Sequence, residues 1–259
     1  MRRVVTQLVF CALAAATPAA TAYALPLAPS PEGARPGIVE VDAHYGEAGD
    51  DVDFLFRLGM LEGHLMVGHE LLKAHQASLA LPHFGHPVRE LYDDISDYLN
   101  GHKFPAFDKQ LVALEAAATV APESPDTEAK YQAVIVVVHK ARELAPAELR
   151  ASLPEMIRVC SDTIDAAAGE YGESLERGRV STLVEYHDSR GFLEYVAQQI
   201  DELKTTHADA QSQGMLDRFK GVLAKAQWIV GDLLPNPTPR ASVGQYRAVA
   251  AEAASIAKQ

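Results

Sequence analysis

The chain has 259 residues, with 35 acidic and 23 basic side chains and a formal net charge of -12. This acidic balance excludes a nucleic-acid-binding protein, which needs a basic surface to neutralise phosphates. Two cysteines exclude a disulfide scaffold and any site with four thiolate ligands, while 48% hydrophobic residues indicate a folded globular chain.

Residues 1–24 have the pattern of a secretory signal peptide. A short basic start and an apolar run over residues 4–16 precede Ala22-Tyr23-Ala24, which offers a cleavage site between small residues. We therefore predict an exported protein with a periplasmic location. No later stretch has the ~18 uninterrupted apolar residues of a spanning helix, so we expect no membrane insertion of the mature chain.

Residues 25–50 are rich in proline, glycine and alanine and show little periodicity, which predicts a flexible linker. From residue 51 onward, apolar residues recur with the 3.6-residue period of amphipathic helices. No stretch shows the convincing two-residue alternation of a strand, so the predicted fold class is all-α. The expected helices cover about residues 52–80, 87–100, 104–120, 124–144, 152–186, 189–207, 215–234 and 242–257.

An internal repeat organises these helices. A shift of 104 residues aligns several positions of the first half with the second, and a shift of 115 residues aligns a later stretch. We predict duplicated four-helix units, at residues 51–146 and 147–259, which form one or two helical bundles. Chance similarity among helical sequences is the alternative. The aligned pairs include Gly68 and Gly172, Leu79 and Leu183, His83 and His187, and Tyr131 and Tyr246.

Histidine is the unusual component of the composition. The chain has ten histidines, about twice a typical share. The second repeat keeps one histidine of the first, His187 opposite His83. A shared fold therefore does not require the others, and the first repeat is the better candidate for a specialised site. Between residues 64 and 102 lie His64, His69, His75, His83, His86 and His102.

Imidazole is the commonest metal ligand in proteins, and ligands on one helix meet the same ion only when three or four residues separate them. A site here therefore needs a second helix. An antiparallel hairpin that turns about residue 83 would bring His64 opposite His102. We predict a transition-metal site for zinc, copper or iron. Its expected ligands are His64, His69, His83 and His86, with Glu62 and His102 as secondary ligands.

These residues also have simpler structural interpretations. A histidine beside the leucine stripe of a helix commonly packs and hydrogen-bonds to its neighbours without an ion. Gly59, Gly63 and Gly68 indicate a close approach of either another helix or a ligand, and helix packing is the simpler explanation. No motif of a hydrolase, a zinc protease or a c-type cytochrome is present, so we predict that the protein is not an enzyme.

Two stretches of the first repeat resemble known proteins. They contain Glu62-Gly63-His64-Leu65 with Val67-Gly68-His69-Glu70-Leu71, and His83-Phe84-Gly85-His86-Pro87 with Glu90-Leu91-Tyr92. This pattern resembles a family of exported all-helical proteins of proteobacteria, and the resemblance implies no particular activity. A distant architectural analogy is with imelysin-like periplasmic proteins, which are helical duplications associated with iron handling. Their G-x-H-x-x-E motif is incomplete here, because Glu62 and Val67 stand at its glycine and glutamate positions.

The sequence thus predicts a periplasmic, non-enzymatic helical protein that captures, buffers or delivers a transition metal. Its expected partners are the metal ion and a membrane transporter or receptor, and not nucleic acid. Two alternatives stay open. One is a ligand-free helical module that binds a partner protein, and the other is non-covalent haem binding between helices.

Overall fold

The computed structural model describes residues 51–259, apart from the side chain of Glu90. The predicted signal peptide at 1–24 and linker at 25–50 lie outside the described residues. Throughout the described part the chain is helical, and its only sheet is a hairpin of two-residue strands. The predicted all-α fold class is therefore confirmed. None of the helices in this part is long and apolar enough to cross a membrane.

The elements alternate between long helices and short connections. In chain order they are α1 (Asp51–Lys73), α2 (Ala77–His86), the π-helical turn η1 (Pro87–Leu91), α3 (Tyr92–Gly101), α4 (Asp108–Val120), α5 (Pro125–Arg142), α6 (Ala147–Arg150), α7 (Leu153–Glu173), β1 (Leu175–Glu176), β2 (Arg179–Val180), α8 (Leu183–Thr206), α9 (Ala210–Val230) and α10 (Val243–Ala257).

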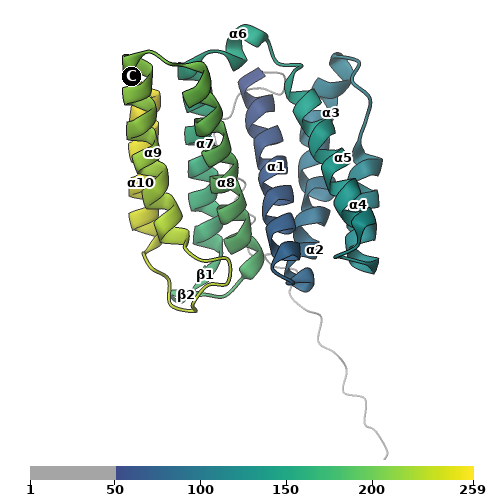
Figure 1. Cartoon of the computed structure of the whole chain (residues 1–259). Helices are drawn as coiled ribbons and strands as arrows, with labels where there is room; N and C mark the ends of the chain where they lie inside the picture. The colour runs from purple at the N-terminus through teal and green to yellow at the C-terminus, as the bar shows by residue number, and fades with distance from the viewer. Residues whose placement is uncertain (1–50) are drawn as a thin grey trace, which may run out of the picture. The chain divides into compact units, whose positions relative to one another are not determined.

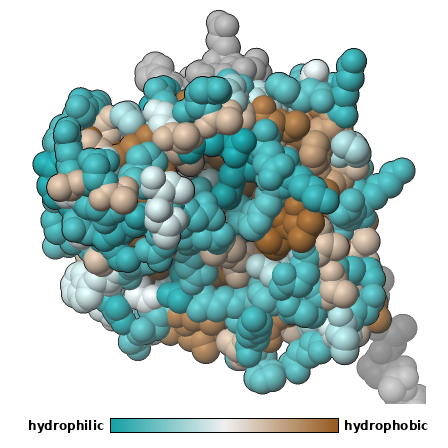
Figure 2. Space-filling view, turned by 45° about the horizontal axis from the view of Figure 1, so that its top comes forward, coloured by the Kyte–Doolittle hydropathy of each residue, from teal (hydrophilic) through white to brown (hydrophobic). Residues whose placement is uncertain are grey.

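The long helices lie side by side, with α1 in the middle (Figure 1). On one side of α1 are α2 to α5, and on the other are α7 to α10. Buried side chains from both sides form one continuous hydrophobic core. The face seen in Figure 2 is mostly hydrophilic, with hydrophobic side chains in separate small patches, as expected for an acidic globular protein.

Glycines allow α1 and α8 to pack closely. A Cβ added to Gly191 of α8 would collide with the carbonyl oxygen of Gly63 on α1, and one added to Gly59 would collide with the ring of Tyr195. This confirms that close helix packing explains the glycines of α1. The close approach brings the next residue of α1, His64, against α8.

The first turn of the chain lies elsewhere than the sequence indicates. We expected α1 to continue to about residue 80, but it ends at Lys73, and the chain reverses over residues 74–76. His75 has a φ of 58° there, the left-handed conformation that glycine and asparagine adopt most easily. Pro82, which lies where the sequence indicated a turn between helices over 52–80 and 87–100, is inside α2. As a result α2 packs against α1, although the sequence predicted one continuous helix to residue 80.

The hairpin between α7 and α8 was also not predicted. The expected helix over 152–186 ends at Glu173, and strands β1 and β2 follow. Their connection, Arg177 and Gly178, has φ values of 52° and 73°. Two consecutive positive φ angles are typical of a tight hairpin turn whose twist matches the flanking strands. As a result α8 begins at Leu183, and it carries Asp188 within its first turns.

Candidate metal centre

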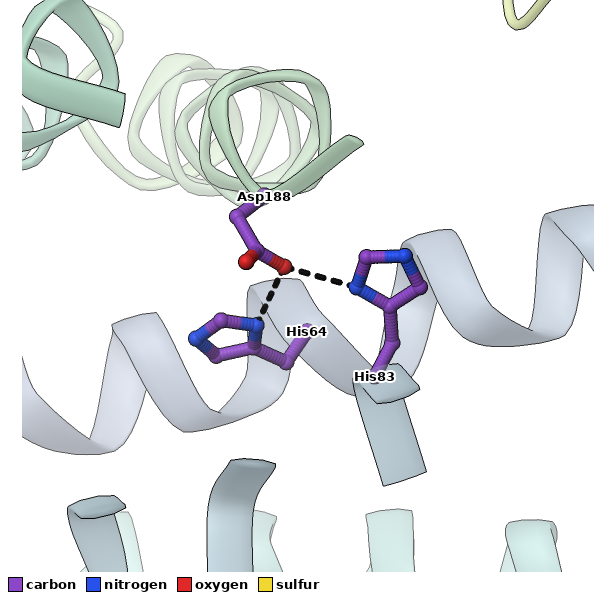
Figure 3. A group of neighbouring side chains, drawn as sticks. All are labelled: His64, His83 and Asp188. Atoms are coloured by element: carbon purple, nitrogen blue, oxygen red, sulfur yellow. Dashed lines mark hydrogen bonds and ion pairs between the residues drawn. The ribbon is translucent and has the colours of Figure 1, made fainter. Parts of the chain in front are cut away.

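Asp188 lies at the centre of a buried polar group between α1, α2 and α8 (Figure 3). Its Oδ1 accepts a hydrogen bond from Nδ1 of His64 at 2.6 Å and another from Nδ1 of His83 at 2.7 Å. One ligand atom from each of the three residues lies within 4.8 Å of the others. Within residues 51–259, no other trio of His, Cys, Asp or Glu meets this criterion.

His86 extends the group toward solvent. Its Nδ1 is 3.6 Å from Oδ2 of Asp188, and its side chain is 23% exposed, against 7% or less for the other three. Its ring also contacts the ring of His64, with 5.6 Å between centroids. His86 is three residues after His83 on the same helix, so both imidazoles reach the same carboxylate.

The charges within the group follow from burial and hydrogen bonding. Burial alone would raise the pKa of Asp188, but the charge of His64 and the hydrogen bonds from His64, His83 and His86 outweigh it and hold this pKa well below its usual range. Asp188 is therefore a carboxylate that only accepts hydrogen bonds. Burial lowers the pKa of His83 in spite of its hydrogen bond to Asp188, which favours the neutral imidazole.

His187 lies next to this group on α8. Its Nε2 donates a hydrogen bond to the carbonyl oxygen of Leu233 at 2.9 Å, and its ring packs edge-on against His83 with 5.5 Å between centroids. Burial lowers the pKa of His187 to about 4, so this ring is neutral at physiological pH. Nδ1 of His187 and Nε2 of His83 are both buried and have no hydrogen-bond partner.

The donor set fits a transition-metal ion. Two imidazole nitrogens and one carboxylate oxygen, with a third imidazole alongside, suit zinc, iron or copper(II), and two histidines with one carboxylate are a recurrent set for non-haem iron. No sulfur donor takes part. The ion would take the place of the two Nδ1 protons that His64 and His83 direct at Asp188. The ligand atoms would therefore have to move apart only slightly from their present distances of 2.6 Å and 2.7 Å.

Glu62, one of the predicted ligands, lies elsewhere with partners of its own. It is buried on α1, and its carboxylate accepts hydrogen bonds from Nε2 of His139 at 2.8 Å and from Nη2 of Arg142 at 2.7 Å. The guanidinium of Arg142 also lies over the ring of Tyr195. This carboxylate therefore forms an ion pair with Arg142 of α5.

His69 and His102 are also separate from the group. Nε2 of His69 is 2.7 Å from Oε2 of Glu128, and its ring stacks on Tyr131. His102 follows the last turn of α3, is exposed, and bonds through Nδ1 to the carbonyl oxygen of Tyr98. The structure thus brings together His64, His83 and His86 of the predicted ligands and places Glu62, His69 and His102 against other partners.

Sequence reasoning missed Asp188. It lies in the predicted second repeat, 124 residues from His64, and no spacing rule connects residues so far apart. One signal did point to this stretch, because the repeat aligns His187 with His83. The residue after that histidine is the carboxylate at the centre of the group.

Comparison with known families adds one finding. Residues 146–259 match the model of the iron permease-associated 4-helix bundle domain. The match runs from the loop before α6 to the end of the chain, and it supports an all-helical bundle. Of the group around Asp188, only His187 and Asp188 lie in the matched part, since His64, His83 and His86 precede it.

Neither a curated protein nor a solved structure gives a match to the chain. The resemblance to exported proteobacterial proteins and the imelysin analogy therefore stay predictions, as do the duplication and its boundaries.

Proposed function

We propose that this protein binds a transition-metal ion, with iron as the first candidate, at His64, His83, His86 and Asp188. The observation that carries the proposal is the buried group in which ligand atoms of His64, His83 and Asp188 lie within 4.8 Å of one another. The match of residues 146–259 to an iron permease-associated domain supports iron as the cargo and a membrane iron transporter as the partner.

In this proposal the ion is cargo, and no chemical step is catalysed. The protein acts outside the cytoplasm, as the signal-peptide pattern predicts, where it captures or buffers the ion and delivers it to the transporter. Asp188 supplies one negative charge and the imidazoles supply neutral donors. Because Asp188 is buried, its attraction for a cation is stronger than that of a carboxylate in water. His86, the most exposed of the four, is the first donor that an incoming ion would meet.

The test is metal binding by the purified protein. We expect about one equivalent of iron, zinc or copper after equilibrium dialysis at micromolar free metal, measured by elemental analysis. Asp188→Asn should lose most of it, because an amide neither carries the charge nor binds these ions well. His102→Ala removes an exposed histidine outside the group and is the matched control. Clearly substoichiometric metal in the wild type, or equal metal in Asp188→Asn, would refute the proposal.

A further inference from the structure

Two buried ring nitrogens next to the candidate metal centre have no hydrogen-bond partner, Nε2 of His83 and Nδ1 of His187. They belong to rings in direct contact, with centroids 5.5 Å apart and planes at 76°. A buried polar atom without a partner is unusual, because it loses its hydrogen bonds to water and gains none in the protein. Because the two atoms belong to rings in contact, we look for one cause that explains both.

The tautomers of the two rings explain why these nitrogens do not pair. His83 donates Nδ1–H to the Asp188 carboxylate, so its neutral ring has a lone pair on Nε2. His187 donates Nε2–H to the carbonyl oxygen of Leu233, so its neutral ring has a lone pair on Nδ1. Both unpartnered atoms are therefore acceptors, and two acceptors cannot form a hydrogen bond with each other.

Binding of an ion changes the tautomer that His83 must adopt. A metal that is coordinated by Nδ1 of His83 needs the lone pair of that nitrogen, so the single proton of the neutral ring must be on Nε2. Nε2 then becomes a buried donor, and an acceptor is needed beside it. His187 offers an unused acceptor, Nδ1, and cannot change its own tautomer without losing the bond to Leu233.

We propose that His187 is a positioning residue for the metal site: its Nδ1 accepts the Nε2–H of His83 once Nδ1 of His83 holds the ion. This inference rests on the proposed function, since it concerns the metal-loaded protein. A metal-bound histidine generally donates its other N–H to a fixed acceptor, which orients the ring and makes it a better ligand. Here the acceptor is itself a histidine, fixed by the backbone of the segment after α9.

Two substitutions separate this role from a merely structural one. His187→Gln can keep a donor near the position of Nε2, toward Leu233, but loses the acceptor at Nδ1. His187→Asn places an amide oxygen near the position of Nδ1 and loses the bond to Leu233. If His187 only tethers the chain after α9, the glutamine variant should behave like wild type. If it positions His83, the asparagine variant should behave like wild type.

The experiment measures zinc affinity and the ring tautomer in the full chain. We expect His187→Gln to bind Zn²⁺ about 10–100-fold more weakly than wild type, and His187→Asn to stay within a few-fold. In wild-type protein, the ¹⁵N NMR signals of the His83 ring should show the proton on Nδ1 without zinc and on Nε2 with zinc. Zinc is the probe because it is diamagnetic.

The outcomes are distinguishable. If wild-type protein binds no zinc, iron or copper, both the proposed function and this inference are overturned. If wild-type protein binds zinc but His187→Gln binds it equally well, or if His83 keeps its proton on Nδ1 in the zinc-loaded protein, the inference alone is overturned. Weaker binding by His187→Asn than by His187→Gln would assign His187 a tethering role instead.

Discussion

At the scale of single residues, the partner of each histidine decides its chemistry. His64 and His83 share one buried carboxylate, whereas His69 and His139 each bond to a glutamate with a different environment. These side chains are alike in the sequence. Only the element packed opposite distinguishes a ligand-like histidine from one in an ordinary ion pair.

The ion pair of Glu62 illustrates the second case. The hydrogen bond from His139 to Glu62 raises the pKa of that histidine, although partial burial opposes the shift. The resulting stabilisation is fully present below about pH 6.5 and is lost as the pH rises through the raised value. Glu62 thus contributes to the stability of the α1–α5 contact.

His187 should make the protein less stable in mild acid. Its pKa falls from 6.5 to about 4 on folding, so the unfolded chain binds one more proton between these values. The free energy of unfolding should therefore decrease as the pH drops from about 6.5 to about 4, by up to about 3 kcal/mol from this group. Urea unfolding of wild type and His187→Gln across this range measures it. Parallel curves for the two proteins would contradict the expectation.

At the scale of elements, the contact of α1 with α8 depends on backbone atoms that touch. Gly63 and Gly191 leave no room for a Cβ between these helices. This close packing brings His64 within hydrogen-bond distance of Asp188. Helix periodicity predicts which face of α1 is apolar, but it does not tell which helix covers that face. The glycines in the sequence indicated a close approach without identifying the partner.

We expect Gly191→Ala to destabilise the protein by about 1–3 kcal/mol, because its methyl group would collide with the backbone of α1 at Gly63. The wider spacing should also weaken metal binding. Gly169→Ala in α7 is the matched control, since nothing lies within 4 Å of that added methyl group. That substitution should stabilise by up to about 1 kcal/mol through helix propensity. Thermal unfolding compares the two, and equal effects would argue against a close α1–α8 contact.

The turn after α1 is the element that sequence reasoning placed wrongly. Neither glycine nor proline marks residues 74–76, and His75 takes the left-handed conformation instead. A turn about residue 83 would have set His64 opposite His102. The actual turn sets it beside His83 and His86, whose rings lie 6.4 Å and 5.6 Å from that of His64. A displacement of the turn by about eight residues, from residue 83 to His75, thus changed the predicted ligand set.

At the scale of the whole molecule, the candidate metal centre joins the two halves of the chain. His64, His83 and His86 come from the first predicted repeat and Asp188 from the second. The part that matches the iron permease-associated domain therefore does not contain a complete site. In Figure 1, α2 to α5 lie on one side of α1 and α7 to α10 on the other, and the ligands come from α1 and from both of these sides.

Because the ligands come from three helices, a bound ion should stabilise the folded protein as a whole. At a free metal concentration 100-fold above Kd, linkage predicts about 2.7 kcal/mol of added stability and a rise in Tm of several degrees. Scanning calorimetry with and without Zn²⁺ measures the shift. Asp188→Asn should show little of it. An equal rise in the variant would indicate binding at other surface histidines.

The sequence by itself determined the helical class, the concentration of histidines near one end of the described chain, and the close packing signalled by glycines. These are local properties, because helix periodicity and residue spacing depend on neighbours within a few positions. The tertiary structure decided that Asp188 joins His64 and His83, that Glu62 pairs with Arg142, and that the ring of His187 packs against that of His83. Such pairings depend on where the turns fall and on which backbones approach closely. One turn without glycine or proline was enough to place His83 and His86, instead of His102, beside His64.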